Sequence, residues 1–120
     1  DLQMYQNKNE EALQSFLTIL QKHKGESIED ETLLKIADIY YQKKDYLKAL
    51  SYYQNILDNH KEGIYIDEAL FFSAEIYRKH LLDNEKAKPL YEKMVLEHPD
   101  SLYYTESRKQ YRTLRGDTTI

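Results

Sequence analysis

The 120-residue chain contains no cysteine and no tryptophan, and only two prolines and three glycines. The lack of cysteine excludes disulfides, thiol catalysis and thiolate metal sites, and it does not discriminate between cellular compartments. So few prolines and glycines leave little material for the turns of a β-rich or loop-rich fold. No apolar run approaches the roughly 20 residues that a membrane-spanning helix needs, so we expect no direct membrane insertion.

The composition is that of one folded domain. Hydrophobic residues make up 41% of the chain and charged residues 32%, which is typical of neither a disordered nor a membrane protein. The net charge of −4 argues against nucleic acid as a partner. Because the chain opens at Asp1 and not at a methionine, we expect it to be a piece of a longer protein.

Aligning the chain with itself shows an internal repeat with spacings of 37 and then 38 residues. Three blocks align at an alanine, an aromatic residue and a histidine: Ala12, Ala49 and Ala87; Phe16, Tyr53 and Tyr91; and His23, His60 and His98. A second type of segment aligns Ala37 with Ala74 and Tyr40 with Tyr77. The chain is therefore an array in which two kinds of segment alternate.

Both kinds of segment have the apolar spacing of an amphipathic helix, as at Leu33, Ile36, Ala37 and Tyr40. Acidic residues mark the expected helix starts, and basic residues or glycine (Gly25, Gly63) mark the expected ends. We predict helices over residues 9–24, 28–43, 46–59, 65–81, 84–97 and 100–114, with residues 1–6 as the end of another helix. Short polar connections predict that neighbouring helices are antiparallel.

These segments resemble the tetratricopeptide repeat, a two-helix unit with a small residue and a tyrosine in its first helix. An alanine, an aromatic residue and a closing proline follow around its second helix. The second unit carries this pattern at Leu33, Ile36, Ala37, Tyr40, Ala49, Tyr53 and Ile56, and the third at Leu70, Ser73, Ala74, Tyr77, Ala87, Tyr91, Met94 and Pro99. The first unit keeps only its second helix, with Ala12, Phe16 and Ile19.

The resemblance implies an all-α fold, a right-handed superhelix of antiparallel helix pairs with a C-terminal capping helix. The repeat array would span residues 1–114, as a partial repeat (1–25), two repeats (28–63 and 64–99) and the cap (100–114), followed by a tail (115–120). The period exceeds the family's usual 34 residues, through an extension after each second helix and one extra residue near Leu82. HEAT-type repeats are the alternative, and their pattern fits less well.

The C-terminal segment looks like the end of bacterial cell-envelope tetratricopeptide proteins, which implies a periplasmic or cell-envelope location. Tyr103, Ser107, Tyr111 and Leu114 share one face of the last predicted helix, as a cap requires. The basic residues outside this face form either a solvated surface or a contact for an acidic partner. The tripeptide Arg115–Gly116–Asp117 occurs in adhesion motifs, and we interpret it as part of the tail.

We expect neither a metal site nor an enzyme in this segment, and no cofactor. The repeating histidines His23, His60 and His98 would lie about 10 Å or more apart, too far for one zinc ion. The acidic pairs lie at helix starts, where carboxylates stabilise the helix, and no catalytic motif accompanies them. An enzyme elsewhere in a longer chain is a third alternative.

The resemblance implies that first helices line a concave face that binds a peptide or helix of a partner protein. Leu34 and Phe71 would be apolar anchors, and Asp38, Glu75 and Arg78 would orient the partner. The complete predicted face is Glu31, Leu34, Asp38 and Tyr41 in the second unit and Glu68, Phe71, Glu75 and Arg78 in the third. The alternatives are that part of this face packs on the cap, and that the segment is a structural cap or forms a homodimer through the exposed ends of the array.

Overall fold

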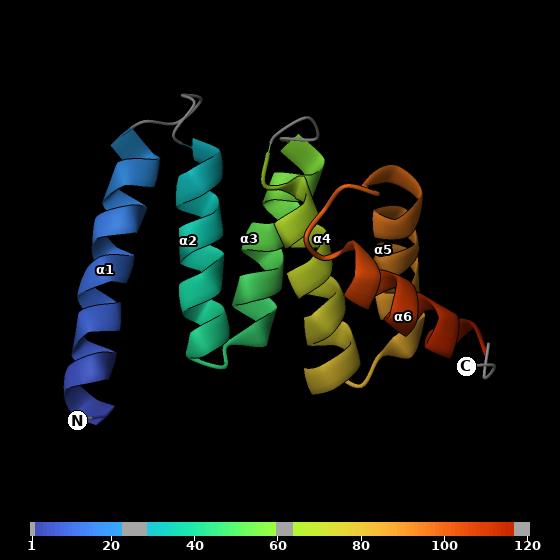
Figure 1. Ribbon diagram of the computed structural model, residues 1–120. Helices are drawn as coiled ribbons and strands as arrows, with labels where there is room; N and C mark the ends of the chain where they lie inside the picture. The colour runs from blue at the N-terminus through green and yellow to red at the C-terminus, as the bar shows by residue number, and fades with distance from the viewer. Residues whose placement is uncertain (1, 23–28, 60–63, 117–120) are drawn as a thin grey trace. The chain divides into compact units, whose positions relative to one another are not determined.

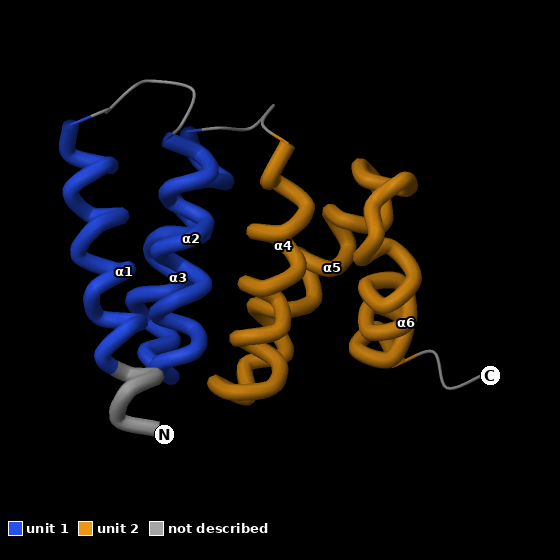
Figure 2. The backbone as a smooth tube through the Cα atoms, turned by 60° about the vertical axis from the view of Figure 1, so that its left-hand side comes forward, with its two compact units in different colours: residues 1–60 blue, residues 61–120 orange. Residues whose placement is uncertain are grey.

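The computed structural model describes residues 2–22, 29–59 and 64–116, without the side chains of residues 2–6. Every regular element in these ranges is helical, and the helices pack as sequential antiparallel pairs, which confirms the predicted all-α fold. The chain divides into two compact units, residues 1–60 and 61–120 (Figure 2). No described helix has the length and apolar character needed to cross a membrane.

The first unit consists of α1 (Leu2–Lys22), α2 (Glu29–Gln42) and α3 (Tyr46–Asn59), which run in alternating directions (Figure 1). Helix α2 contacts both α1 and α3, so an unusually wide arc of its surface is covered. Its buried residues are Thr32, Leu33, Leu34, Ile36, Ala37, Ile39 and Tyr40. Helix α3 buries Ala49, Tyr53, Ile56 and Leu57, at the spacing that the sequence predicts for one apolar face.

Helix α1 corrects one prediction, because it runs unbroken from Leu2 to Lys22. We predicted a helix over 9–24 and the end of a separate helix over 1–6. Neither proline nor glycine interrupts residues 2–22, so nothing in the backbone favours a break there. The predicted glycine stops, Gly25 and Gly63, lie outside the described residues.

The connection between α2 and α3 is a tight turn built on Lys44, whose φ of 65° lies in the left-handed region. The backbone N–H of Asp45 donates to the Tyr40 carbonyl and that of Lys44 donates to the Tyr41 carbonyl, both at 2.9 Å. This pair of bonds is a Schellman motif, which satisfies carbonyls at the end of α2. The antiparallel hairpin follows from this turn.

The second unit contains α4 (Ile66–Glu75), a π-helical turn η1 (Ile76–His80), α5 (Asn84–Glu97) and α6 (Tyr104–Arg115). Helix α5 contacts α4, η1 and α6. Ala74, Ala87 and Tyr91 form the buried cluster of this unit, and Phe71, Tyr77, Leu90, Tyr111 and Leu114 pack against it. The predicted helix 65–81 thus ends in a π-helical turn, and the predicted helix 100–114 begins later, at Tyr104.

The π-helical turn accounts for the extra residue of this repeat. Lys44 and Leu82 both have positive φ, and each lies five residues before the aligned alanine, Ala49 or Ala87. The additional residue therefore precedes Leu82, where the Leu81 N–H donates to the Ile76 carbonyl at 3.0 Å, five residues back. A π-helical turn is the usual way in which a helix absorbs one inserted residue.

Candidate partner-binding surface

The predicted binding face carries a polar contact to a buried tyrosine in each unit. In the first unit, the Tyr53 hydroxyl donates to Asp38 Oδ1 at 2.6 Å, which joins α3 to α2. Tyr53 is 1% exposed, so this contact joins a buried tyrosine to the half-buried Asp38. Partial burial raises the pKa of Asp38 above its usual value, and the Tyr53 hydroxyl and Lys35 only partly oppose this shift.

In the second unit, the equivalent tyrosine is Tyr91, which is fully buried. Arg78 Nε donates to the Tyr91 hydroxyl at 3.0 Å, and Arg78 Nη2 donates to Glu75 Oε2 at 2.8 Å. Lys79 Nζ lies 3.2 Å from the same Glu75 oxygen, so two cations compensate a carboxylate that is 4% exposed. Burial raises the pKa of Tyr91 to about 12, so the hydroxyl stays protonated at neutral pH.

The two contacts involve the aligned tyrosines Tyr53 and Tyr91 but differ in the position and chemistry of the partner, since Asp38 aligns with Glu75 and Arg78 aligns with Tyr41. A carboxylate accepts from the tyrosine hydroxyl in the first unit, whereas a guanidinium donates to it in the second. Both contacts fix a charged side chain of the first helix of a pair against the second helix of that pair. The guanidinium has five N–H donors and these two bonds use two of them, while 23% of the Arg78 side chain stays exposed.

The predicted apolar anchors are less accessible than we expected. Leu34 is 4% exposed, because α2 is covered by helices on two sides, and it belongs to the core. The Phe71 ring is half-buried and stacks on Tyr103 with the ring centroids 4.6 Å apart. Tyr103 immediately precedes α6, so this part of the predicted face packs on the segment that leads into the last helix.

The remaining predicted residues differ in exposure. Glu31 is exposed, and Asp38, Tyr41, Glu68 and Arg78 are half-buried. Tyr41 makes an edge-to-face contact with Tyr46, with centroids 5.8 Å apart, so the hairpin turn supports its ring. Each unit thus presents a partly accessible polar surface on its first helix, not an apolar groove.

Sequence reasoning missed the hydroxyls of Tyr53 and Tyr91 as the groups that hold this surface. The repeat pattern identified both residues only as aligned aromatics, and both are buried. The signal was the use of tyrosine at a buried position, because a buried hydroxyl needs a hydrogen-bond partner. The charged residues Asp38 and Arg78 were available in the sequence as hydrogen-bond partners for these two hydroxyls.

The other candidate residues give no chemical site in the described ranges. Of the repeating histidines, only His98 is described, at the C-terminal end of α5, and His23 and His60 lie outside the described residues. Within those ranges, no three His, Asp or Glu side chains gather in a way that would hold a metal ion. In the tripeptide, Gly116 ends α6 with a φ of 96°, and Asp117 is outside the described residues.

Comparison with known families matches the Tetratricopeptide repeat at residues 31–62 and 68–101. The two matches cover more than half of the chain. The chain belongs to the tetratricopeptide repeat family. Tetratricopeptide repeats generally act as protein-interaction modules and are typically non-catalytic, and no catalytic domain matches. No curated protein matches the chain.

Proposed function

We propose that this tetratricopeptide segment binds a peptide or helix of a partner protein through the accessible surface of α2 in the first unit and through that of α4 and η1 in the second unit. The observation that carries the proposal is the pair of contacts from the aligned tyrosines Tyr53 and Tyr91, which hold Asp38 and Arg78 in place. Side chains that are ordered before binding lose less conformational entropy when a partner docks, so they favour binding at the same contact area.

The partner-facing residues of this proposal are Glu31, Asp38 and Tyr41 on α2, Glu68 on α4 and Arg78 on η1. Arg78 would donate to a carbonyl or carboxylate of the partner, and Tyr41 would supply an aromatic contact of the kind that dominates many interfaces. Leu34 and Glu75 support this face from the core, and Phe71 supports it through Tyr103. Partner binding by any of the eight residues stays a prediction.

The test compares two variants with matched substitutions. Tyr41→Ser/Glu68→Lys alters the proposed face, and Tyr52→Ser/Glu85→Lys makes the same changes on α3 and α5. Affinity purification with quantitative mass spectrometry should recover the partner with the wild type and the control, and on the order of tenfold less with the face variant. Equal recovery by both variants, with unchanged helicity by circular dichroism, would refute the proposed face. A Leu34→Glu variant would test nothing, because it buries a charge.

A second role, as the terminal cap or self-association segment of a longer array, is supported by α6. Its Ser107 is fully buried, and Tyr111 and Leu114 pack on the cluster around Tyr91, while Arg108 and Lys109 are exposed. We therefore propose the predicted boundaries, repeats at 28–63 and 64–99 and a cap at 100–114. Light scattering over a concentration series tests self-association, and a strict monomer would exclude it.

Only the resemblance of the C-terminal segment supports an origin in the bacterial cell envelope, which we keep as part of this proposal. Expression of the full-length protein followed by cell fractionation tests this location. Recovery in the cytoplasmic fraction would contradict it.

A further inference from the structure

Tyr103 covers the aromatic part of the proposed binding surface in the second unit. Its ring stacks on Phe71 with the centroids 4.6 Å apart and the planes 17° apart, and it meets Phe72 edge to face. Phe71 itself packs against the buried cluster of the unit, and its ring meets that of Tyr91 edge to face at 6.4 Å. Phe71 is therefore fixed by the core, while one face of its ring is covered by Tyr103.

Tyr103 belongs to a surface segment, residues 99–103, which we call the strap. Pro99, Asp100 and Leu102 are exposed, and Leu102 reaches 94%. The strap contains no regular helix. An open depression of about 400 Å³ lies between the strap, the end of α5 and the start of α4. Few packed side chains therefore resist a movement of the strap on that side.

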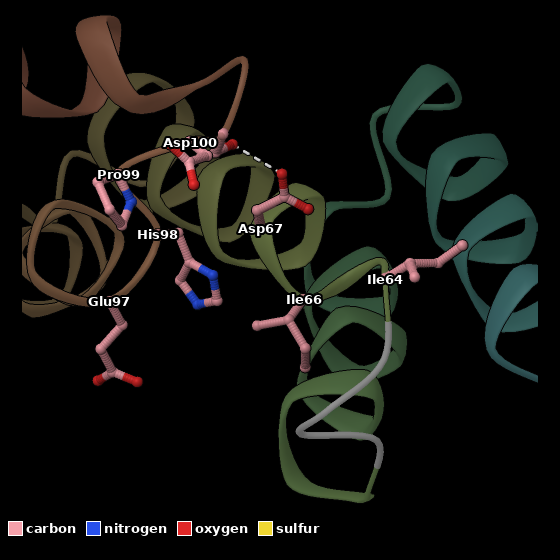
Figure 3. A pocket seen from close by; sticks show the side chains of 8 residues that line it. Ile64, Ile66, Asp67, Glu97, His98, Pro99 and Asp100 are labelled. Atoms are coloured by element: carbon pink, nitrogen blue, oxygen red, sulfur yellow. Dashed lines mark hydrogen bonds between the residues drawn. The ribbon is translucent and has the colours of Figure 1, made fainter.

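A serine fastens the strap to α4. The Ser101 hydroxyl donates to Asp67 Oδ2 at 2.7 Å, the bond drawn as a dashed line in Figure 3, and the Tyr103 N–H donates to Ser101 Oγ at 3.1 Å. One hydroxyl thus links the backbone of Tyr103 to the start of α4. Tyr111 and Leu114, further along the chain, pack α6 against the buried cluster. Release of the serine would therefore free the strap and leave α6 in place.

We propose that Tyr103 is an internal occupant of the binding surface, and that an aromatic side chain of the partner protein takes its place on Phe71. This inference rests on the proposed function, to which it adds a partner chemistry and a means of regulation. The site selects an aromatic ring, because a flat ring already fills it between a stacked and an edge-on neighbour.

The internal occupant also sets the affinity. A partner must displace Tyr103, so its apparent affinity is reduced in proportion to the fraction of molecules in which the strap is open. Arg78 and Phe71 both contact Tyr91, so the guanidinium and the aromatic ring are held by one residue. A partner segment that carries an aromatic residue close to a carboxylate or carbonyl would engage both groups.

The test is a titration of the whole chain with the peptide acetyl-Ala-Tyr-Ala-amide, followed by amide chemical shifts at Phe71 and Phe72. Tyr103→Ser should bind the peptide about tenfold more tightly than the wild type, because the internal ring no longer competes. Ser101→Ala keeps the ring and loses the bond to Asp67, so it should tighten binding about 2- to 10-fold. The peptide acetyl-Ala-Leu-Ala-amide should bind Tyr103→Ser about 3- to 10-fold more weakly than the tyrosine peptide does.

Tyr52→Ser is the matched control. Tyr52 is a half-buried tyrosine of the first unit that stacks on Tyr40 with the centroids 5.7 Å apart, so the loss of its ring should leave the shifts at Phe71 as in the wild type. A purely structural role of Tyr103 would lower stability in its variant without raising the affinity for the peptide.

Equal affinity of the wild type and both strap variants for the tyrosine peptide, or equal binding of the leucine peptide, would overturn the proposal. Circular dichroism checks that each variant keeps its helicity, and if Tyr103→Ser lost it, the result with Ser101→Ala would decide. The affinity purification with Tyr41→Ser/Glu68→Lys does not depend on this titration. The strap and the partner-binding surface can therefore fail separately.

Discussion

The aligned alanines Ala12, Ala49 and Ala87 provide a sharp test of the packing. Ala49 and Ala87 are completely buried, whereas Ala12 is only half-buried on α1. Replacing either buried alanine with leucine adds three carbon atoms where neighbouring helices already touch. Alanine and leucine are both good helix formers, so the substitutions change packing far more than helix propensity.

We expect Ala87→Leu to lower the free energy of unfolding by about 1–3 kcal/mol, the usual cost of overpacking a filled core. Ala87 packs beside Ala74 and Tyr91 at the contact of α4 with α5, and no side chain there can move into solvent without exposing apolar surface. Ala49→Leu should cost a similar amount at the contact of α2 with α3. Ala12→Leu should change stability by less than about 0.5 kcal/mol, because the added atoms reach solvent.

Urea denaturation followed by circular dichroism measures these differences. A loss of 1 kcal/mol should lower the melting temperature by roughly 3–6 °C in a chain of this size. If Ala12→Leu destabilised the chain as much as Ala87→Leu, or if Ala87→Leu had no effect, the assigned repeat register would be wrong.

Three further predictions concern single side chains. Burial raises the pKa of Asp38, so the wild type should lose stability relative to Asp38→Asn as the pH rises from about 3 to about 7. Urea titrations at several pH values measure this difference, and the opposite trend would contradict the burial of the carboxylate. Leu82→Gly should raise the free energy of unfolding by about 0.5–1 kcal/mol, because Leu82 has a φ of 53°, which glycine adopts without strain, and its side chain is 81% exposed. A loss of stability in thermal melts would contradict this and show that the leucine side chain makes a stabilising contact. Pro89→Ala should raise the melting temperature, because Pro89 lies inside α5 and cannot donate to the Glu85 carbonyl; an unchanged value would mean that the helix is already distorted there.

The apolar spacing of the sequence predicted the all-α fold, but it missed the unbroken course of α1 and the π-helical turn. Tyr40 and Tyr53 carry the repeat pattern, and they are 9% and 1% exposed. Tyr46 contacts Tyr41 at the hairpin turn, while Tyr52 is partly exposed on α3 and stacks on Tyr40. These outcomes depend on local periodicity, which a helix reproduces directly.

The surface was harder to predict because its accessibility depends on which helices cover it. Position within a repeat placed Leu34 on an open face, but helices on two sides leave it in the core. The repeat spacing showed that the third unit has one extra residue. Whether a longer turn or a π-helical turn holds this residue depends on small differences in hydrogen-bond energy, which the periodicity of the sequence does not reveal. Partner contact by Glu75 stays a prediction, and the charge of its buried carboxylate is compensated by Arg78 and Lys79.

Site-specific photo-crosslinking tests the central claim most directly, namely that the accessible surface of α2 in the first unit and that of α4 in the second unit bind a partner protein. A photoreactive phenylalanine analogue would replace Tyr41 or Glu68 on this face, and Gln54 or Lys93 on the exposed surfaces of α3 and α5. Positions 41 and 68 should both crosslink to the same partner, and positions 54 and 93 should not. Crosslinks from 54 and 93 alone, or equal crosslinking from all four positions, would contradict the account.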